Sequence, residues 1–223
     1  MMDIMEAMRC RHSVRRYKDT PIEGETLALL QQEISRINEE SGLHIQLVLN
    51  EHKAFDCAMA RYGKFSGVNN YIALVGKNDT QLQEKTGYYG ERLVLYAQQL
   101  GLHTCWVALT YKKIPQAFTV QKGEKLAVVI SVGYGKLRGL PRKSKSAEEV
   151  SNITPQSPDW FRAGVEGALL APTAMNQQKF TFTLMPDGSV RARAGVGFYT
   201  KMDLGIARYH FEVASGKEIR WIG

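Results

Sequence analysis

Five cations and a histidine lie within ten residues near the N-terminus. The segment reads RCRHSVRRYK and runs from Arg9 to Lys18. Arg11, Ser13 and Arg15 alternate in it, so an extended backbone would place their side chains on one face. Two guanidinium forks and a hydroxyl are the donors that a phosphate dianion requires. The cluster indicates an anion site inside the fold; the alternatives are a solvated charged face, a nucleic-acid backbone or an acidic membrane surface.

A second group of polar residues occurs near the C-terminus, in the segment LAPTAMNQQK. Asn176 and Gln178 carry carboxamides, which supply both hydrogen-bond donors and acceptors. They follow residues whose small side chains permit the close approach of a flat ring, namely Pro172, Thr173 and Ala174. Taken alone, the segment is more typical of an ordinary turn between a helix and a strand.

A third group lies in the polar segment GKLRGLPRKSKS, residues 135–146, which has five cations and no apolar periodicity. Such a composition predicts a loop or linker. Its cations Arg142, Lys143 and Lys145 are candidates for an anion site, although loop cations are usually only solvated.

Composition narrows the class of protein. The chain has 223 residues, 44% hydrophobic and 23% charged, as in ordinary globular proteins with one core. Its three cysteines show no CxxC spacing and its five histidines no HExxH spacing, so we expect no disulfide framework and no metal site. No apolar run approaches the ~20 residues of a membrane helix, and MMDIMEAMRC lacks the features of a signal peptide. We therefore expect a cytoplasmic protein that does not contact membranes.

Apolar periodicity and turn residues predict the secondary structure. Helices are expected over residues 4–8, 23–41, 81–100, from 158 to before Pro172, and 203–214, with Ser157 as the cap of the fourth. Strands are expected over 45–49, 70–75, 104–109, 126–134, 180–185, 190–194 and 218–221. Because helices and strands are mixed without strict alternation, the expected class is α+β with antiparallel or mixed sheets flanked by helices.

A helix-loop-strand order occurs twice, over residues 25–50 and 158–185. The first unit follows the basic cluster, and the second carries the Asn/Gln segment. Helix-loop-strand units are common, so this repeat alone is weak evidence for two related halves.

Four motifs in matching order resemble the FMN-dependent nitroreductase family. RHSVRRY resembles its signature R-R-S-x-R-x-F, and GYYGERLVLYAQQLGLHTCW resembles its helix and strand ending in L-G-L-G-T-C-W. VVISVGYG with the following PRKSKSAEEV resembles its I-x-x-G-Y-P strand and basic R-K-P-L-E-E segment. APTAMNQQ resembles A-P-S-x-x-N-x-Q-P.

The position of the last motif is similar to a subgroup of that family. In ordinary members it comes early, and two chains pair to build each flavin site. Here it is near the C-terminus and is followed by MDLGIARYHFEVA, as in single-chain members whose two half-units form a pseudo-dimer. The resemblance implies one nitroreductase-like domain over residues 1–223, with half-units of approximately 1–146 and 147–223, in a monomer.

The resemblance implies FMN as the cofactor and assigns it a set of residues. Its phosphate would bind Arg11 and Ser13, and one or two of Arg142, Lys143 and Lys145 would close this site from the other side. His12 would point elsewhere or give its backbone N–H to the ribityl chain. Arg15 would face the pyrimidine edge, share the phosphate or have a structural role. The flavin ring would meet Asn176 and Gln178 and the residues before them. The complete implied set is Arg11, His12, Ser13, Arg15, Ala108, Leu109, Arg142, Lys143, Lys145, Pro172, Thr173, Ala174, Asn176 and Gln178.

The implied activity is transfer of hydride from NAD(P)H to FMN and then of electrons to a nitroaromatic, a quinone or a similar acceptor, with ping-pong kinetics. It needs no catalytic side chain, because the cofactor carries the chemistry. One alternative is a flavin-binding or sensing module with little turnover, favoured by Val107, Ala108 and Leu109 where the family has small glycines. A nucleic-acid binder is disfavoured, because no RNP-like, finger or helix-turn-helix pattern accompanies the charge.

Overall fold

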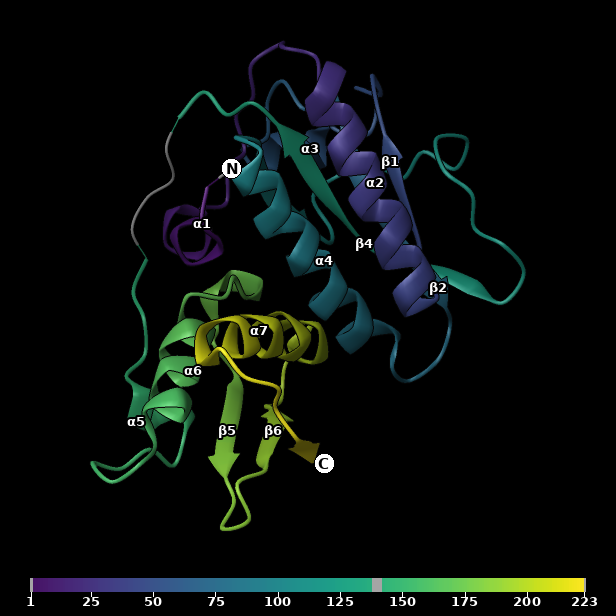
Figure 1. The fold of residues 1–223 in the computed structure, drawn as a ribbon. Helices are drawn as coiled ribbons and strands as arrows, with labels where there is room; N and C mark the ends of the chain where they lie inside the picture. Colours follow the sequence, from purple (N-terminus) through teal and green to yellow (C-terminus); the bar gives the residue numbers. More distant parts are fainter. Residues whose placement is uncertain (1, 138–141, 223) are drawn as a thin grey trace. The chain divides into compact units, whose positions relative to one another are not determined.

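The computed structural model describes residues 2–137 and 142–222, which form two compact units. The first comprises Met1–Asp3, Cys10–Leu82 and Leu93–Leu140, and the second Ile4–Arg9, Gln83–Arg92 and Pro141–Gly223. One helix, α4 (Leu82–Gln99), has residues in both units (Figure 1). Helices and antiparallel strands occur in each unit, so the expected α+β class is confirmed.

The first unit contains a four-stranded sheet in the order β1-β2-β4-β3. All three pairings are antiparallel, with one irregularity between Leu74 and Val75. The strands are β1 (His44–Val48), β2 (Tyr71–Lys77), β3 (His103–Val107) and β4 (Glu124–Gly133). The central strand β2 is buried along nearly its whole length, as its apolar sequence predicts. Helices α2 (Gly24–Ser41) and α3 (Ala58–Tyr62) complete this unit.

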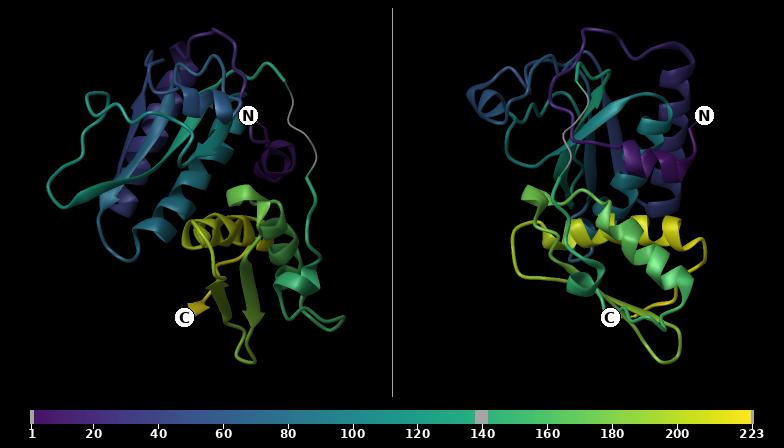
Figure 2. Two further views of the ribbon diagram at one scale, coloured as in Figure 1. Left: turned by 180° about the vertical axis from the view of Figure 1, so that it is seen from behind. Right: turned by 90° about the vertical axis from the view of Figure 1, so that its left-hand side faces the viewer.

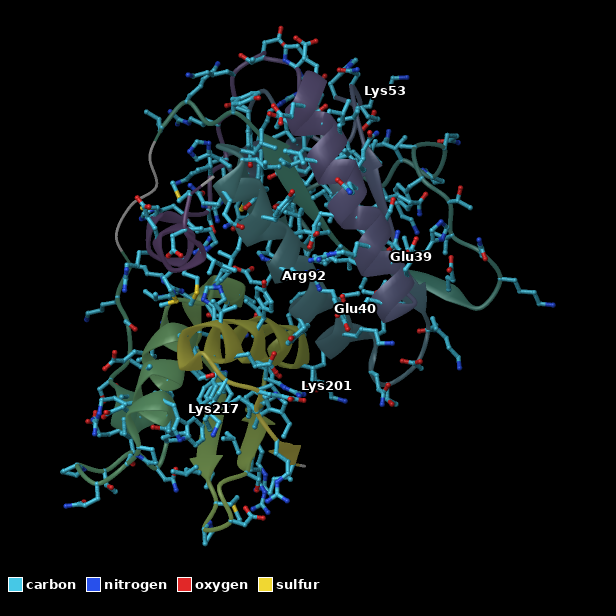
Figure 3. The ribbon with its side chains drawn as sticks, viewed as in Figure 1. Glu39, Glu40, Lys53, Arg92, Lys201 and Lys217 are labelled. Carbon is cyan, nitrogen blue, oxygen red and sulfur yellow. The ribbon has the colours of Figure 1, made fainter. Side chains whose placement is uncertain are left out.

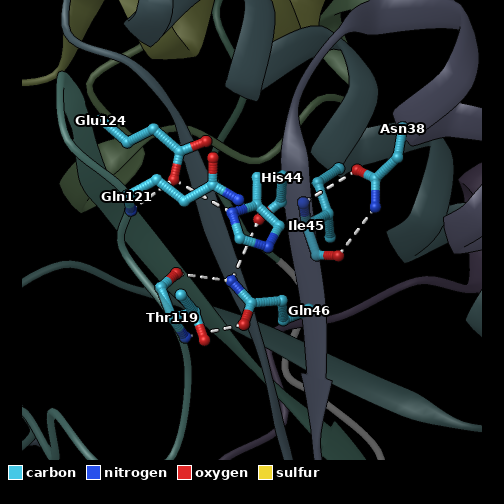
Figure 4. A network of polar contacts seen from close by, with 7 residues as sticks. All are labelled: Asn38, His44, Ile45, Gln46, Thr119, Gln121 and Glu124. Atoms are coloured by element: carbon cyan, nitrogen blue, oxygen red, sulfur yellow. Dashed lines mark hydrogen bonds and ion pairs between the residues drawn. The ribbon is translucent and has the colours of Figure 1, made fainter.

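Two side-chain carboxamides fix strand β1, one that bonds its backbone and one that it carries itself. The Asn38 carboxamide, near the end of α2, accepts from the Ile45 N–H at 2.8 Å and donates to the Ile45 carbonyl at 2.9 Å. The Gln46 carboxamide makes the same two kinds of bond with the backbone of Thr119, at 2.7 and 2.8 Å (Figure 4). Asn38 thus satisfies both backbone groups of Ile45 as a neighbouring strand would, and Gln46, a residue of β1, attaches the loop at Thr119 to this edge strand.

The second unit contains a three-stranded sheet and most of the remaining helices. Its strands are β5 (Phe180–Leu184), β6 (Val190–Ala194) and β7 (Trp221–Ile222); β5 and β6 form an antiparallel hairpin and β7 pairs parallel with β6. Its helices are α1 (Ile4–Cys10), α5 (Ala147–Val150), α6 (Asp159–Leu169) and α7 (Thr200–Ser215). Helices α6 and α7 pack together, and α7 contacts both strands of the hairpin (Figure 2).

Helix α7 approaches its neighbours at backbone distance. A Cβ on Gly205 would lie 2.0 Å from the Glu84 carbonyl oxygen, and one on Gly87 would lie 2.1 Å from the Met202 carbonyl oxygen. Further along α7, the buried His210 ring contacts the Glu91 carboxylate at 2.9 Å and the Gly167 carbonyl at 3.2 Å. These contacts explain why α7 carries glycine and histidine at those positions.

Several predicted boundaries are wrong. The third strand ends at Val107 rather than at residue 109, and α7 begins at Thr200 rather than at Asp203. Ser157 is not the cap of α6: the cap position is Pro158, and the Ser157 hydroxyl accepts from the Thr154 N–H at 2.9 Å instead. The short helices α3 and α5 were not predicted because too few residues show periodicity.

Charged side chains project outward from the helices and loops of both units, as Lys53 and Lys201 do (Figure 3). No helix within the described residues is both long and apolar enough to traverse a bilayer.

The close approach of α7 predicts the effect of Gly205→Ala. The added methyl group would overlap backbone rather than a flexible side chain, so the free energy of unfolding should fall by about 3 kcal/mol. Lys201→Ala, an exposed change on the same helix, should change it by less than about 0.5 kcal/mol. Chemical denaturation of both variants provides the measurement. A Gly205→Ala protein as stable as the wild type would contradict the packing described for α7.

Candidate functional site

The basic segment is extended and fixed on both sides. Ser13 forms a bridge with Thr104 of β3, and the Val14 N–H donates to the Thr104 carbonyl at 3.0 Å. On its other side the Tyr17 N–H donates to the Ser66 carbonyl at 3.0 Å. The sequence motif therefore lies on the first unit as an added strand-like segment, not as a free arm.

Burial along this segment recurs every third residue rather than every second. Val14 and Tyr17 are buried in the core of the first unit, whereas Ser13 and Arg15 are exposed. Arg11 is the exception among the polar residues, with only 7% of its surface exposed.

Arg11, Ser13 and Arg15 all act on the thiol of Cys105 in β3. Burial raises the pKa of this thiol, while the Arg15 charge, a hydrogen bond from Ser13 and the Arg11 charge act in the opposite direction. Ser13 therefore lies within hydrogen-bond reach of this thiol, and the charges of both arginines favour its ionised form.

Two neighbouring residues have other contacts. The His12 ring Nδ1 donates to the Cys10 carbonyl at 2.7 Å, so this ring is turned toward its own backbone. The Arg15 guanidinium carbon lies 5.8 Å from the centre of the Phe65 ring, within the range of a cation–π contact. The Phe65 ring thus limits the directions that the Arg15 side chain takes.

Ala108 and Leu109 follow the end of β3 in a bend. Leu109 is 68% exposed, and Ala108 is half-buried. Val107, the first of the three residues that replace glycines of the family motif, packs into the core and is 2% exposed. Its side chain therefore faces inward, away from the surface on which Leu109 is exposed.

The other predicted residues come together in the second unit. Arg142 donates to the carbonyls of Leu169 and Ala171, both at 2.7 Å, and so binds backbone groups at the C-terminal end of α6. It also donates to the Asn176 side-chain oxygen at 3.2 Å, while the Asn176 amide donates to the Lys143 carbonyl at 2.8 Å. Asn176 is thus held to the basic segment through both ends of its carboxamide.

Gln178 makes a second connection to the same segment. Its side-chain oxygen accepts from the Lys145 N–H at 2.8 Å, and its carbonyl accepts from the Lys145 ammonium at 2.9 Å. Its own N–H donates to the Thr173 hydroxyl at 3.1 Å, and only 2% of its surface is exposed. The predicted cofactor residues therefore form two sets, one in each unit.

The loop that carries these carboxamides has an unusual backbone. Met175, Asn176 and Gln178 have φ angles of 51°, 55° and 45°, which side-chain-bearing residues rarely adopt. Such conformations persist where surrounding bonds hold them, and here they lie at the proposed site. The Met175 side chain is entirely exposed.

Sequence reasoning missed Asp203, the buried residue behind this loop. Its carboxylate is 2% exposed and accepts from the Ala174 N–H at 2.9 Å and from the Gln177 amide at 2.7 Å. Burial raises the pKa of Asp203 to about 6, against the opposing effect of the two hydrogen bonds. The sequence signal was present in MDLGIARYHFEVA, where this aspartate was interpreted only as a helix start.

Comparison with known proteins gives the family. A sequence profile described as "Putative TM nitroreductase" matches residues 3–215. The chain belongs to this family. No curated protein matches it.

Solved structures of nitroreductases share the fold. One from Thermotoga maritima, named a "putative nitroreductase", aligns over 96% of this chain and 83% of its own, with a TM-score of 0.66 and 21% identity. One from Desulfovibrio desulfuricans, crystallised in complex with FMN, aligns over 70% and 99%, with a TM-score of 0.54 and 19% identity. A nitroreductase family protein of Clostridium difficile aligns over 69% and 99%, with a TM-score of 0.52 and 19% identity.

The raised pKa of Asp203 predicts how stability depends on pH. A carboxyl whose pKa is higher in the folded state than its ordinary 3.8 stabilises the fold below about pH 4, and this contribution is lost as pH rises through 6. From this group alone the free energy of unfolding should fall by about 2 kcal/mol between pH 4 and pH 7. Asp203→Asn cannot ionise, so its denaturation curves should lack this decrease. An unchanged pH dependence in that variant would show that Asp203 does not titrate in this window.

Proposed function

We propose that the protein is an FMN-dependent oxidoreductase that takes hydride from NAD(P)H and reduces a nitroaromatic, a quinone or a similar small acceptor. The observation that carries the proposal is the extended basic segment held against β3, in which Arg11, Ser13 and Arg15 all act on the Cys105 thiol. Membership of the nitroreductase family supports it, as does the fold shared with the FMN complex from D. desulfuricans.

Arg11 and Ser13 fit the phosphate monoester of FMN by the chemistry of their donors. A guanidinium offers a planar pair of N–H groups to two phosphate oxygens, and a hydroxyl donates one more bond. Because Arg11 is largely buried, its attraction to a dianion is screened less than that of a surface cation. The chain has no GxGxxG turn for a pyrophosphate, which favours FMN over FAD.

Arg15 has a further role in this proposal. A cation near the pyrimidine edge of a flavin stabilises the negative charge that appears on reduction. Arg15 is exposed, and its position is limited by the Phe65 ring, so it is suited to approach a ligand without a large loss of side-chain entropy. The same guanidinium would otherwise share the phosphate with Arg11.

Asn176 is the residue of the Asn/Gln loop that we assign to the flavin ring. A carboxamide has two N–H groups and two lone pairs, and the bonds of Asn176 to Lys143 and Arg142 use one of each. One donor and one acceptor remain, on an exposed side chain. Gln178 is buried, so its contribution is the shape of the loop that Pro172, Thr173 and Ala174 begin.

When bound, the flavin supplies the hydride-accepting and electron-transferring chemistry. The protein groups position it and supply charge, and none of them acts as acid, base or nucleophile in this proposal. Donor and acceptor would use one face in turn, which gives ping-pong kinetics.

A flavin-binding module with little turnover is the second candidate. Its supporting feature is the replacement of family glycines at residues 107–109, of which Val107 faces the core and Leu109 is exposed. If these replacements obstruct a ligand, the obstructing side chain is therefore that of Leu109.

One chain would supply both motifs to one flavin. The arginine motif occurs once, at residues 11–15, and the Asn/Gln loop once, at 173–178. Two-chain members of the family carry both motifs in each chain and make two sites. Pairing within one chain would make the site independent of protein concentration.

The phosphate assignment predicts a selective effect of Arg11→Ala. Loss of a charge-assisted contact to a dianion should weaken FMN binding ten- to a hundredfold, whereas riboflavin, which lacks the phosphate, should lose far less. Fluorescence titrations with both flavins measure the two dissociation constants. Arg16→Ala, an exposed cation of the same segment, is the control and should leave both unchanged. Equal losses for FMN and riboflavin in Arg11→Ala would show that Arg11 acts through folding.

The single-chain assignment is tested by mixing Arg11→Ala with Asn176→Ala chains. If each chain builds its own site, every chain in the mixture keeps one damaged motif, and tight FMN binding is not recovered. If two chains exchange motifs, a mixed dimer regains one intact site. Recovery of tight binding on mixing would therefore contradict the monomeric site.

A further inference from the structure

The motif MDLGIARYHFEVA is not explained by the proposed function. Gly205 permits the close approach of α7 to another backbone, and His210 bonds two neighbouring groups. Both are accounted for by packing. Asp203 differs, because burial of a carboxylate costs free energy that packing does not offset. Its presence is explained only by the hydrogen bonds that it accepts.

Asp203 supplies a cap that the Asn/Gln loop lacks. The turn Ala174–Asn176 is a 3₁₀ helix whose cap residue, Thr173, makes no side-chain bond to the turn's backbone. The Thr173 hydroxyl instead accepts from the Gln178 N–H. The first N–H of the turn, on Ala174, is bonded by the Asp203 carboxylate at 2.9 Å. Asp203, which lies in α7, therefore acts as the N-terminal cap of this turn.

The same carboxylate connects two loops. Its second oxygen accepts from the Gln177 amide at 2.7 Å, and that amide also donates to the Phe198 carbonyl at 2.9 Å. Gln177 thus needs an acceptor on each side. An aspartate provides one and a main-chain carbonyl the other, which ties residues 174–177 to the loop before α7.

These bonds lie beside the most unfavourable backbone of the loop. Met175 and Asn176 have positive φ angles and follow directly after the amide that Asp203 holds. A loop with this conformation relaxes when the groups that hold it are removed. The orientation of the Asn176 carboxamide therefore depends on Asp203 through the loop backbone between Ala174 and Gln177.

We propose that Asp203 is a positioning residue for flavin binding, which holds the Asn/Gln loop through Ala174 and Gln177 so that Asn176 presents its free donor and acceptor. The inference rests on the proposed function. It makes ring affinity, rather than phosphate affinity, depend on a residue of α7 that does not itself touch the cofactor.

Flavin titrations of Asp203→Ala, Asp203→Asn and Phe211→Leu test the proposal. Asp203→Ala should weaken FMN and riboflavin binding equally, by about tenfold or more, because it loosens the ring contact and leaves the phosphate contact intact. Asp203→Asn keeps an acceptor for the Ala174 N–H but turns an N–H group toward the Gln177 amide, so it should weaken binding of both flavins less than Asp203→Ala does. Phe211→Leu, a buried change elsewhere in α7, should lower the melting temperature without changing either affinity.

Hydrogen exchange without flavin provides an independent arm. The N–H groups of Asn176, Gln177 and Gln178 are bonded within the loop, so they should be protected in the wild type and in Phe211→Leu. They should exchange faster in Asp203→Ala.

The outcomes separate the two proposals. Wild-type protein that binds neither FMN nor riboflavin would overturn the proposed function. Wild-type protein that binds both, with Asp203→Ala unchanged in affinity or in loop exchange, would overturn the inference alone. A loss confined to FMN would also overturn it, because Asp203 would then act on the phosphate.

Discussion

Burial of Tyr17 is the constraint on which the candidate phosphate site depends. The ring is 2% exposed, and its hydroxyl donates to the Val14 carbonyl at 2.7 Å and contacts the Ser131 hydroxyl at 2.9 Å in β4. With Val14 and Tyr17 fixed inward, Ser13 and Arg15 beside them are exposed, whereas Arg11 is largely buried. The backbone of the cationic segment is thus held in place because an aromatic residue of the same segment is anchored in the core.

In the second unit, the candidate site residues are held by hydrogen bonds rather than by a buried aromatic ring. Its Asn/Gln loop has no buried aromatic anchor, and its residues adopt backbone conformations that are unfavourable in isolation. Arg142 and Asp203 hold it from two sides through bonds to carbonyls and N–H groups. The loop is thus fixed by polar contacts, which are sensitive to single substitutions, whereas the basic segment is fixed by packing.

Patterns of single residue types predicted much of the fold. Apolar periodicity located α2 and α4 to within two residues at each end, and the turn residues Pro-Asp-Gly-Ser located the hairpin of β5 and β6. Each of these features depends on interactions between residues that are close in the sequence, so a local pattern of residue types is enough to predict it.

Features that depend on contacts between distant residues were missed. Arg142 was considered as a phosphate ligand, and its bonds to the end of α6 have no signature in the sequence around it. Asp203 lies in a motif that was noticed, but its bond to a turn 29 residues away cannot be inferred from that motif. A local competitor was missed as well: Ser157 has the residue type of a helix cap, but its hydroxyl is bonded by Thr154.

The central claim is that this chain binds FMN and uses it to transfer electrons. The most direct measurement is the visible spectrum of the purified protein, followed by chromatography of the extracted cofactor and anaerobic addition of NADH or NADPH. The account predicts a yellow protein that releases FMN, about one per chain, and loses its colour when the nicotinamide is added. Release of FAD, or a colourless protein that fails to take up added FMN, would contradict it; a yellow protein that keeps its colour would instead identify a flavin-binding module.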